Sequence, residues 1–264
     1  MGPPEMYPIQ RAVSELQLTG FGPPIPLTPH TPDEWISQLT TLPLMHQPGE
    51  KWMYNAGSYV LGVLIARASG QPLETFLRER IFVPLGMRDT GFSVPVAKLD
   101  PLATAADPET GALKLDDDVA DSKWRRPPAF PDAGGGLVST IDDYLVGQMM
   151  LNNGKHGSER ILSRPSVETM TTDQLTPGQK AVSGFFPGYF DSRGWGFGLS
   201  MVTKRDDISA VPGRFGWDGG SGTSWYSDPK EELTAILMTQ RGGFPLLSGV
   251  YLDFWTSVYQ AIDD

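Results

Sequence analysis

Two segments of the sequence combine residue types that can do chemistry. The first, Pro48–Tyr59, places Tyr54 and Asn55 just before an apolar run, and the second, Phe215–Thr223, is a glycine-rich stretch around Trp217. A tyrosine can transfer a proton, and backbone N–H groups at a strand end can bind a developing oxyanion. Each segment alone is weak, because loop tyrosines usually anchor packing and glycines at strand ends usually make turns. The two together predict a site.

Other kinds of catalytic centre have less support in the sequence. The chain has no cysteine, which excludes thiolate catalysis and cysteine-bound zinc, and it has neither a His-Glu-x-x-His motif nor a Walker loop. We therefore expect no metal and no cofactor. The histidines, His30, His46 and His156, lie in loop-like contexts, and Gly219–Thr223 only approaches a Gly-x-Ser-x-Gly elbow. A recruited serine with His46 or His156 as its base stays open as an alternative.

The composition limits the partners of the chain. Its 264 residues carry 31 acidic and 21 basic side chains, a net charge of −10, which repels nucleic acid. Hydrophobic residues make up 39% of the chain, but no run reaches the roughly 18 apolar residues of a membrane span. The sequence thus predicts a soluble protein, cytoplasmic if Met1 is the true start, that binds a small-molecule ester or β-lactam-like substrate.

Helix signals dominate the chain up to about residue 175. Residues 1–31 form a proline-rich, irregular lead-in with one helical turn near Ile9–Leu16, and Thr31 then caps a helix that runs to about Leu42. Gly57–Ser69 predicts a buried, nearly all-apolar helix that Gly70 ends. The remaining signals in this part predict an amphipathic helix at Pro72–Phe82, a hairpin turning at Asp107–Gly111, and a helix from a Ser139 cap to about Asn152.

The last third of the chain changes to a strand pattern. Strands are predicted at 195–203, 222–227 and 233–239, and a helix at about 248–262 closes the chain. Consecutive strands with short turns indicate an antiparallel sheet flanked by helices, which is an α+β fold. The predicted organisation is a lead-in at 1–31 and one domain at 32–264, helical over about 32–175, with the sheet and terminal helix over about 190–264.

In the order and spacing of its motifs the chain resembles the serine β-lactamase and penicillin-binding-protein superfamily, on the side of class C β-lactamases and β-lactamase-fold esterases. Pro48–Phe92 is similar to that family's tyrosine loop and following helices, and Gly134–Tyr144 to its glycine-rich turn into a helix. Trp217-Asp218-Gly219 stands where the family has Lys-Thr-Gly or His-Thr-Gly. The resemblance implies a β-lactamase/transpeptidase-like fold.

The resemblance also implies a mechanism and roles for residues. In the family, a serine in a Ser-x-x-Lys motif attacks a carbonyl and forms an acyl-enzyme, and lysine and tyrosine move the proton. The resemblance assigns the role of proton shuttle to Tyr54 and that of one oxyanion-binding N–H to Gly220. The residues that would bind substrate are Asn55, Trp217, Asp218 and Gly219.

The chain departs from the family where the nucleophile is expected. No Ser-x-x-Lys lies among the 53 residues before Tyr54, and the one at Ser227–Lys230 contains Pro229 and is typical of a strand ending in a turn. The fold is therefore expected to be incomplete at its amino-terminal side. An open strand edge and exposed apolar helix faces would follow, so we expect a homo-oligomer or an amino-terminal segment supplied in trans.

Two further departures concern the substrate. Asn55 directly follows the tyrosine, one residue earlier than in the family, and Trp217 replaces a lysine that would bind a substrate carboxylate. Both changes favour esters over β-lactams or D-Ala-D-Ala peptides. Two alternatives stay open: a truncated, non-catalytic relative that serves as a binding or structural module, and β-lactamase or D-Ala-D-Ala carboxypeptidase activity when the fold is complete.

Overall fold

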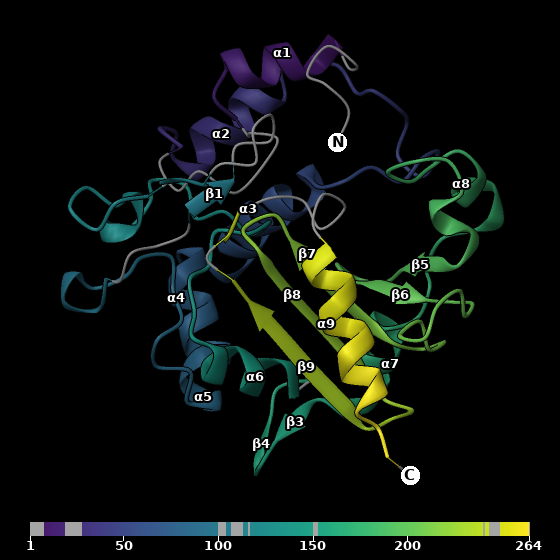
Figure 1. Ribbon diagram of the computed structural model, residues 1–264. Coiled ribbons are helices and arrows are strands. Elements are labelled where there is room, and N and C mark those ends of the chain that lie inside the picture. Colours follow the sequence, from purple (N-terminus) through teal and green to yellow (C-terminus); the bar gives the residue numbers. More distant parts are fainter. Residues whose placement is uncertain are drawn as a thin grey trace.

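A five-stranded antiparallel sheet forms the centre of the molecule (Figure 1). The computed structural model describes residues 8–18, 28–99, 104–106, 113–115, 117–149, 153–239, 241–242 and 249–263. The strands lie in the order β5-β6-β7-β8-β9. Their bounds are Arg193–Trp195, Ser200–Val202, Phe215–Gly219, Thr223–Asp228 and Leu233–Met238. The predicted α+β class, with an antiparallel sheet flanked by helices, is confirmed.

Strand alternation gives the sheet two apolar faces. Trp225 on β8 faces a core that contains Phe215 and residues of the helical part, whereas Tyr226 faces helix α9, Gly249–Gln260. Helix α9 lies across one face of the sheet (Figure 1), and helical residues that include Leu85, Tyr144 and Met170 pack on the other face. Since both faces are covered, the sheet is the middle layer of three.

The helices at the start of the chain follow their predicted signals closely. Helix α1, Pro8–Glu15, is longer than the single turn expected in the lead-in, and α2, Pro32–Leu39, has the Thr31 capping box. Leu18 is buried against Trp35 of α2, whose indole N–H donates to the Leu18 carbonyl at 2.7 Å. This part of the lead-in therefore packs on the domain.

Helix α3, Ala56–Ser69, begins one residue before the predicted Gly57 and ends as predicted before Gly70, whose φ of 68° is left-handed. Tyr59, Gly62 and Val63 are buried. The expectation that the whole helix is buried is wrong, because Val60, Leu61 and Leu64 are 37%, 55% and 55% exposed. Among the described residues, the packed stripe of α3 faces α2, Leu73 and the loop that carries Phe130 and Ala133.

The next elements bring small corrections. The helix predicted at 72–82 consists of α4 (Leu73–Leu77), a π-helical turn (Arg78–Phe82) and α5 (Val83–Leu85). Helix α6, Ile141–Met149, is capped by Thr140 rather than Ser139, because the Thr140 hydroxyl accepts from the Asp143 N–H at 3.3 Å, while the Ser139 hydroxyl contacts Thr90. Residues 150–152, where this helix was expected to end, lie outside the described part.

Strands β1 (Thr104–Ala106) and β2 (Leu113–Leu115) pair antiparallel, as the predicted hairpin requires, and the turn residues 107–112 lie outside the described part. The strand predicted at 195–203 is the hairpin of β5 and β6, because Gly198 adopts a φ of 78° between them. The remaining elements are the 3-10 turns Val96–Lys98, Lys123–Arg125 and Tyr189–Asp191, strands β3 (Lys155–His156), β4 (Glu159–Arg160) and β10 (Arg241–Gly242), and helices α7 (Arg164–Met170) and α8 (Pro177–Ala181).

Candidate active site

The fold brings the two predicted segments into direct contact. The Trp217 indole N–H donates a hydrogen bond to the Tyr54 hydroxyl oxygen at 3.0 Å, across 163 residues of sequence. Tyr54 lies in the loop just before α3, and Trp217 lies on β7. A packed helix thus fixes the loop of Tyr54, and a central strand of the sheet fixes Trp217. Because both elements are rigid, the pair is well positioned for chemistry.

Aromatic rings enclose Tyr54. The ring centroids of Trp217, Phe185, Trp195 and Trp52 lie 5.2, 5.3, 6.0 and 6.1 Å from that of Tyr54. The Trp52 backbone N–H donates to the Ser183 hydroxyl at 3.0 Å and ties the tyrosine loop to the segment that carries Phe185. Most of these rings meet edge to face or tilted, the geometry that aromatic pairs prefer. The surroundings of the phenol are therefore apolar.

Burial raises the pKa of Tyr54 above its ordinary value of 10. Hydrogen bonds from Trp217 and Asn55 oppose this shift, and the charge of Asp132 adds to it. None of these three groups is cationic. At neutral pH the phenol therefore keeps its proton, and a positive charge must come close before Tyr54 can act as a base.

Asp132 is a buried carboxyl beside this site that the sequence analysis missed. Its side chain accepts from the Gly134 backbone N–H at 2.6 Å and the residue is only 6% exposed. A Cβ added to Gly134 would lie 3.1 Å from Asp132 Oδ1 and 3.6 Å from Asn55 Nδ2, so this loop lies against Asn55. Desolvation raises the pKa of Asp132 to about 6. The only local signal in the sequence is an aspartate two residues before a run of three glycines.

The turn between β7 and β8 holds the predicted oxyanion residues. Gly220 lies in this turn and is partly exposed, and the Gly222 N–H closes the turn onto the Gly219 carbonyl at 3.2 Å. A Cβ at Gly219 would lie 2.4 Å from Thr223 Oγ1, so a larger residue does not fit there. Asp218 does not join the Tyr54 group, because it shares the opposite face of the sheet with Ser224, its partner across the strands.

Two other residues that could act as nucleophile or base, Ser227 and His30, have structural contacts. Ser227 is 1% exposed on β8 and its hydroxyl pairs with that of Thr234 at 2.8 Å, which confirms the strand interpretation. His30 Nε2 lies 2.8 Å from the Leu16 carbonyl. Within the described part of the chain no group of three or more metal-binding side chains occurs, and no helix has the length and apolarity needed to cross a membrane.

A comparison with protein families places the chain. The model of the Beta-lactamase family matches residues 14–249, which include both site segments. The chain belongs to the Beta-lactamase family. The expected resemblance is thereby confirmed.

Several known proteins are similar to this Beta-lactamase-family chain. Protein Rv1367c of Mycobacterium tuberculosis is 39% identical over 223 residues, covering 79% of this chain and 53% of that protein. Esterase EstB of Burkholderia gladioli is 30% identical, covering 78% and 54%. The chain thus spans about half the length of both relatives. In structure it is similar to EstCE1, a hydrolase with promiscuous acyltransferase activity, with a TM-score of 0.75 and 23% identity, covering 97% of this chain and 67% of EstCE1.

Proposed function

We propose that the chain forms the proton-transfer and oxyanion part of a serine-hydrolase site that cleaves carboxylic esters through an acyl-enzyme. The observation that carries the proposal is the 3.0 Å hydrogen bond from Trp217 to Tyr54, which joins two family motifs in an apolar surrounding. The relationship to a protein named an esterase, EstB, supports the same reaction class.

In this proposal the nucleophilic serine and a lysine come from a segment outside the 264 residues. The serine oxygen attacks the ester carbonyl carbon, and its proton passes to Tyr54, which the lysine charge holds ionised. The carbonyl electron pair moves onto the oxygen, which the Gly220 N–H stabilises. When the tetrahedral species collapses, the bond to the alkoxide breaks, and the proton passes from Tyr54 to the alkoxide. Water then releases the acyl group by the same steps.

The preference for esters over β-lactams rests on what surrounds Tyr54. Trp217 stands where the related β-lactamases have a cation for the substrate carboxylate, and its indole contacts further rings, Trp195 and Phe185. An apolar wall favours an uncharged acyl group and gives a carboxylate no partner. Substitution Trp217→Lys should therefore lower ester turnover and reduce the preference for esters.

The test uses both the 264-residue chain and the protein encoded by its longest reading frame. We expect a Ser-x-x-Lys helix in that frame, labelling of its serine by a fluorophosphonate, and faster hydrolysis of p-nitrophenyl butyrate than of nitrocefin. The 264-residue chain alone should not be labelled. A reading frame without a Ser-x-x-Lys motif, or a folded complete protein that hydrolyses no ester, would contradict the proposal.

A second candidate is a non-catalytic relative that binds a ligand at the aromatic residues around Tyr54. It is favoured by the absence of any Ser-x-x-Lys other than Ser227–Lys230, whose serine is buried in the sheet. Binding of an ester-shaped ligand without turnover, by the complete protein, would select this alternative.

A further inference from the structure

Asp218 is the one side chain of the Trp217-Asp218-Gly219 motif that points away from Tyr54. Its Oδ1 accepts a hydrogen bond from the Ser224 hydroxyl at 2.5 Å, and its Oδ2 accepts one from the Tyr226 hydroxyl at 3.0 Å. Both donors lie on β8, the neighbouring strand. Because each carboxylate oxygen has a partner inside the protein, Asp218 is poorly placed to bind a substrate.

The bonds of Asp218 continue into the last helix. The Trp255 indole N–H of α9 donates to the Ser224 hydroxyl at 2.9 Å, and the Tyr251 hydroxyl donates to the Gly219 carbonyl at 3.4 Å. Helix α9 therefore holds the end of β7 at two adjacent residues, once through Ser224 and once at Gly219.

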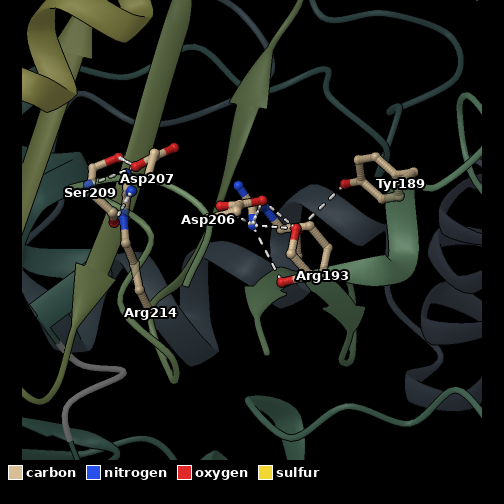
Figure 2. A network of polar contacts seen from close by, with 8 residues as sticks. Tyr189, Arg193, Asp206, Asp207, Ser209 and Arg214 are labelled. Atoms are coloured by element: carbon tan, nitrogen blue, oxygen red, sulfur yellow. Dashed lines mark hydrogen bonds and ion pairs between the residues drawn. The ribbon is translucent and has the colours of Figure 1, made fainter. Parts of the chain in front are cut away.

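Two arginines act on the charge of the Asp218 carboxylate. Burial raises the pKa of Asp218, while Ser224, Tyr226, Arg214 and Arg193 act in the opposite direction. The Arg214 guanidinium stacks over Tyr226 at 4.1 Å from the ring centroid and donates to the Ser209 carbonyl at 2.6 Å. Arg193 is bound to Asp206 (Figure 2). These arginines compensate the negative charge of the Asp218 carboxylate from a distance, while its oxygens stay bonded to Ser224 and Tyr226.

Trp217 and Asp218 share one peptide unit on an alternating strand, so fixing one side chain fixes the direction of the other. Gly219 and Gly220, which follow, have no side chains of their own to hold the turn. The hydrogen bonds of Asp218 and Tyr251 supply that restraint from the opposite face of the sheet.

We propose that Asp218 is a positioning residue: it clamps the end of β7 to β8 and α9 and so holds the Trp217 indole N–H on the Tyr54 oxygen and the Gly220 turn in place. The importance of that placement for catalysis rests on the proposed function, whereas the clamp itself does not. A site motif is thus controlled by the carboxyl-terminal helix on the other side of the sheet.

The clamp can be tested in the 264-residue chain without any activity assay. The indole N–H of Trp217 gives its own ¹H–¹⁵N signal, which Trp217→Phe identifies among those of the seven tryptophans. In Asp218→Ala we expect this signal to move in the direction that Tyr54→Phe moves it, and its hydrogen exchange to become about tenfold faster, the effect of losing one hydrogen bond. Asp218→Asn, which keeps one acceptor oxygen, should give an intermediate result.

A matched control separates positioning from a general loss of stability. Asp228 is also buried on β8 and accepts from the Tyr259 hydroxyl of α9 at 2.7 Å, at the other end of the strand. Asp228→Asn should lower the melting temperature without moving the Trp217 signal. If Asp218→Ala does not fold, Tyr226→Phe removes one donor and keeps the carboxylate. An unmoved Trp217 signal in the folded Asp218 or Tyr226 variants overturns the clamp, whereas a failed ester assay bears only on the proposed function.

Discussion

At the scale of single residues, Tyr54 is paired with a neutral hydrogen-bond donor. From the sequence, Trp217 is expected to line the substrate site in place of a cation. The structure shows that its indole N–H also donates to the Tyr54 oxygen. A neutral donor stabilises the ionised phenol less than a cation does, so the pKa of Tyr54 stays raised. The lowering of the Tyr54 pKa that proton transfer requires must come from a cation that approaches the site.

Asp132 gives the chain a predictable dependence of stability on pH. Its pKa is raised from 3.8 to about 6, so the folded protein binds this proton more tightly than the unfolded chain. The stability due to the neutral carboxyl is present below about pH 4 and is lost as the pH rises through about 6, up to about 3 kcal/mol. In Asp132→Asn, denaturant unfolding from pH 4 to 8 should show less of this decline.

The matched control is Asp121→Asn, because Asp121 is an exposed carboxyl on a neighbouring loop. It should leave the pH dependence of the unfolding free energy as in the parent chain. Equal decline in the parent chain and Asp132→Asn would contradict the assignment of the raised pKa.

At the scale of elements, α3 allows one substitution to be tried in two environments. A Cβ at Gly57 meets nothing within 4 Å, whereas one at Gly62 would lie 2.9 Å from the Ala133 Cβ and 3.1 Å from Leu73. Gly57→Ala should stabilise the chain by up to about 1 kcal/mol through helix propensity. Gly62→Ala should destabilise it by about 1–3 kcal/mol through overpacking. Urea unfolding measures both, and equal signs would show that the α3 packing is misassigned.

Elements with local start and stop signals were predictable. The Thr31 capping box and the left-handed Gly70 depend on interactions within a few residues, and they correctly predicted the start of α2 and the end of α3. Helix α2 ends at Leu39, earlier than the predicted Leu42. The sequence did not distinguish Ser139 from Thr140 as the cap of α6, because both are good caps and the long-range contact of Ser139 with Thr90 decides between them. Long-range contacts also explain the missed part of the site.

The missed residues come from segments that only the tertiary fold joins. Tyr54 and Trp217 were found through motifs, but Phe185, Trp195 and Asp132 lie in other segments, and no local pattern there indicates a contact with Tyr54. The local sequence does not distinguish an aromatic residue that lines the site from one that packs in the core. The exposure of one face of α3 was missed for the same reason. An all-apolar helix indicates burial, but its sequence does not show which element covers each face.

At the scale of the whole molecule, the exposed apolar face of α3 predicts self-association. Val60, Leu61 and Leu64 are contiguous on this helix, and such patches promote association in water. Light scattering after gel filtration should give a mass above the 28.8 kDa of one chain. Leu61→Glu with Leu64→Glu should shift the chain toward the monomer. Val182→Glu, at an exposed apolar position directly after α8, should not. A monodisperse parent monomer would contradict this prediction.

The central claim is that Tyr54 transfers the proton in an ester-cleaving serine-hydrolase site. The most direct measurement is p-nitrophenyl butyrate hydrolysis by the protein encoded by the complete reading frame, compared with its Tyr54→Phe variant. The account predicts fluorophosphonate-sensitive turnover whose kcat falls about 100-fold or more in the variant, at an unchanged melting temperature, because general acid–base catalysis contributes about that much. Equal kcat values for the two proteins would contradict it.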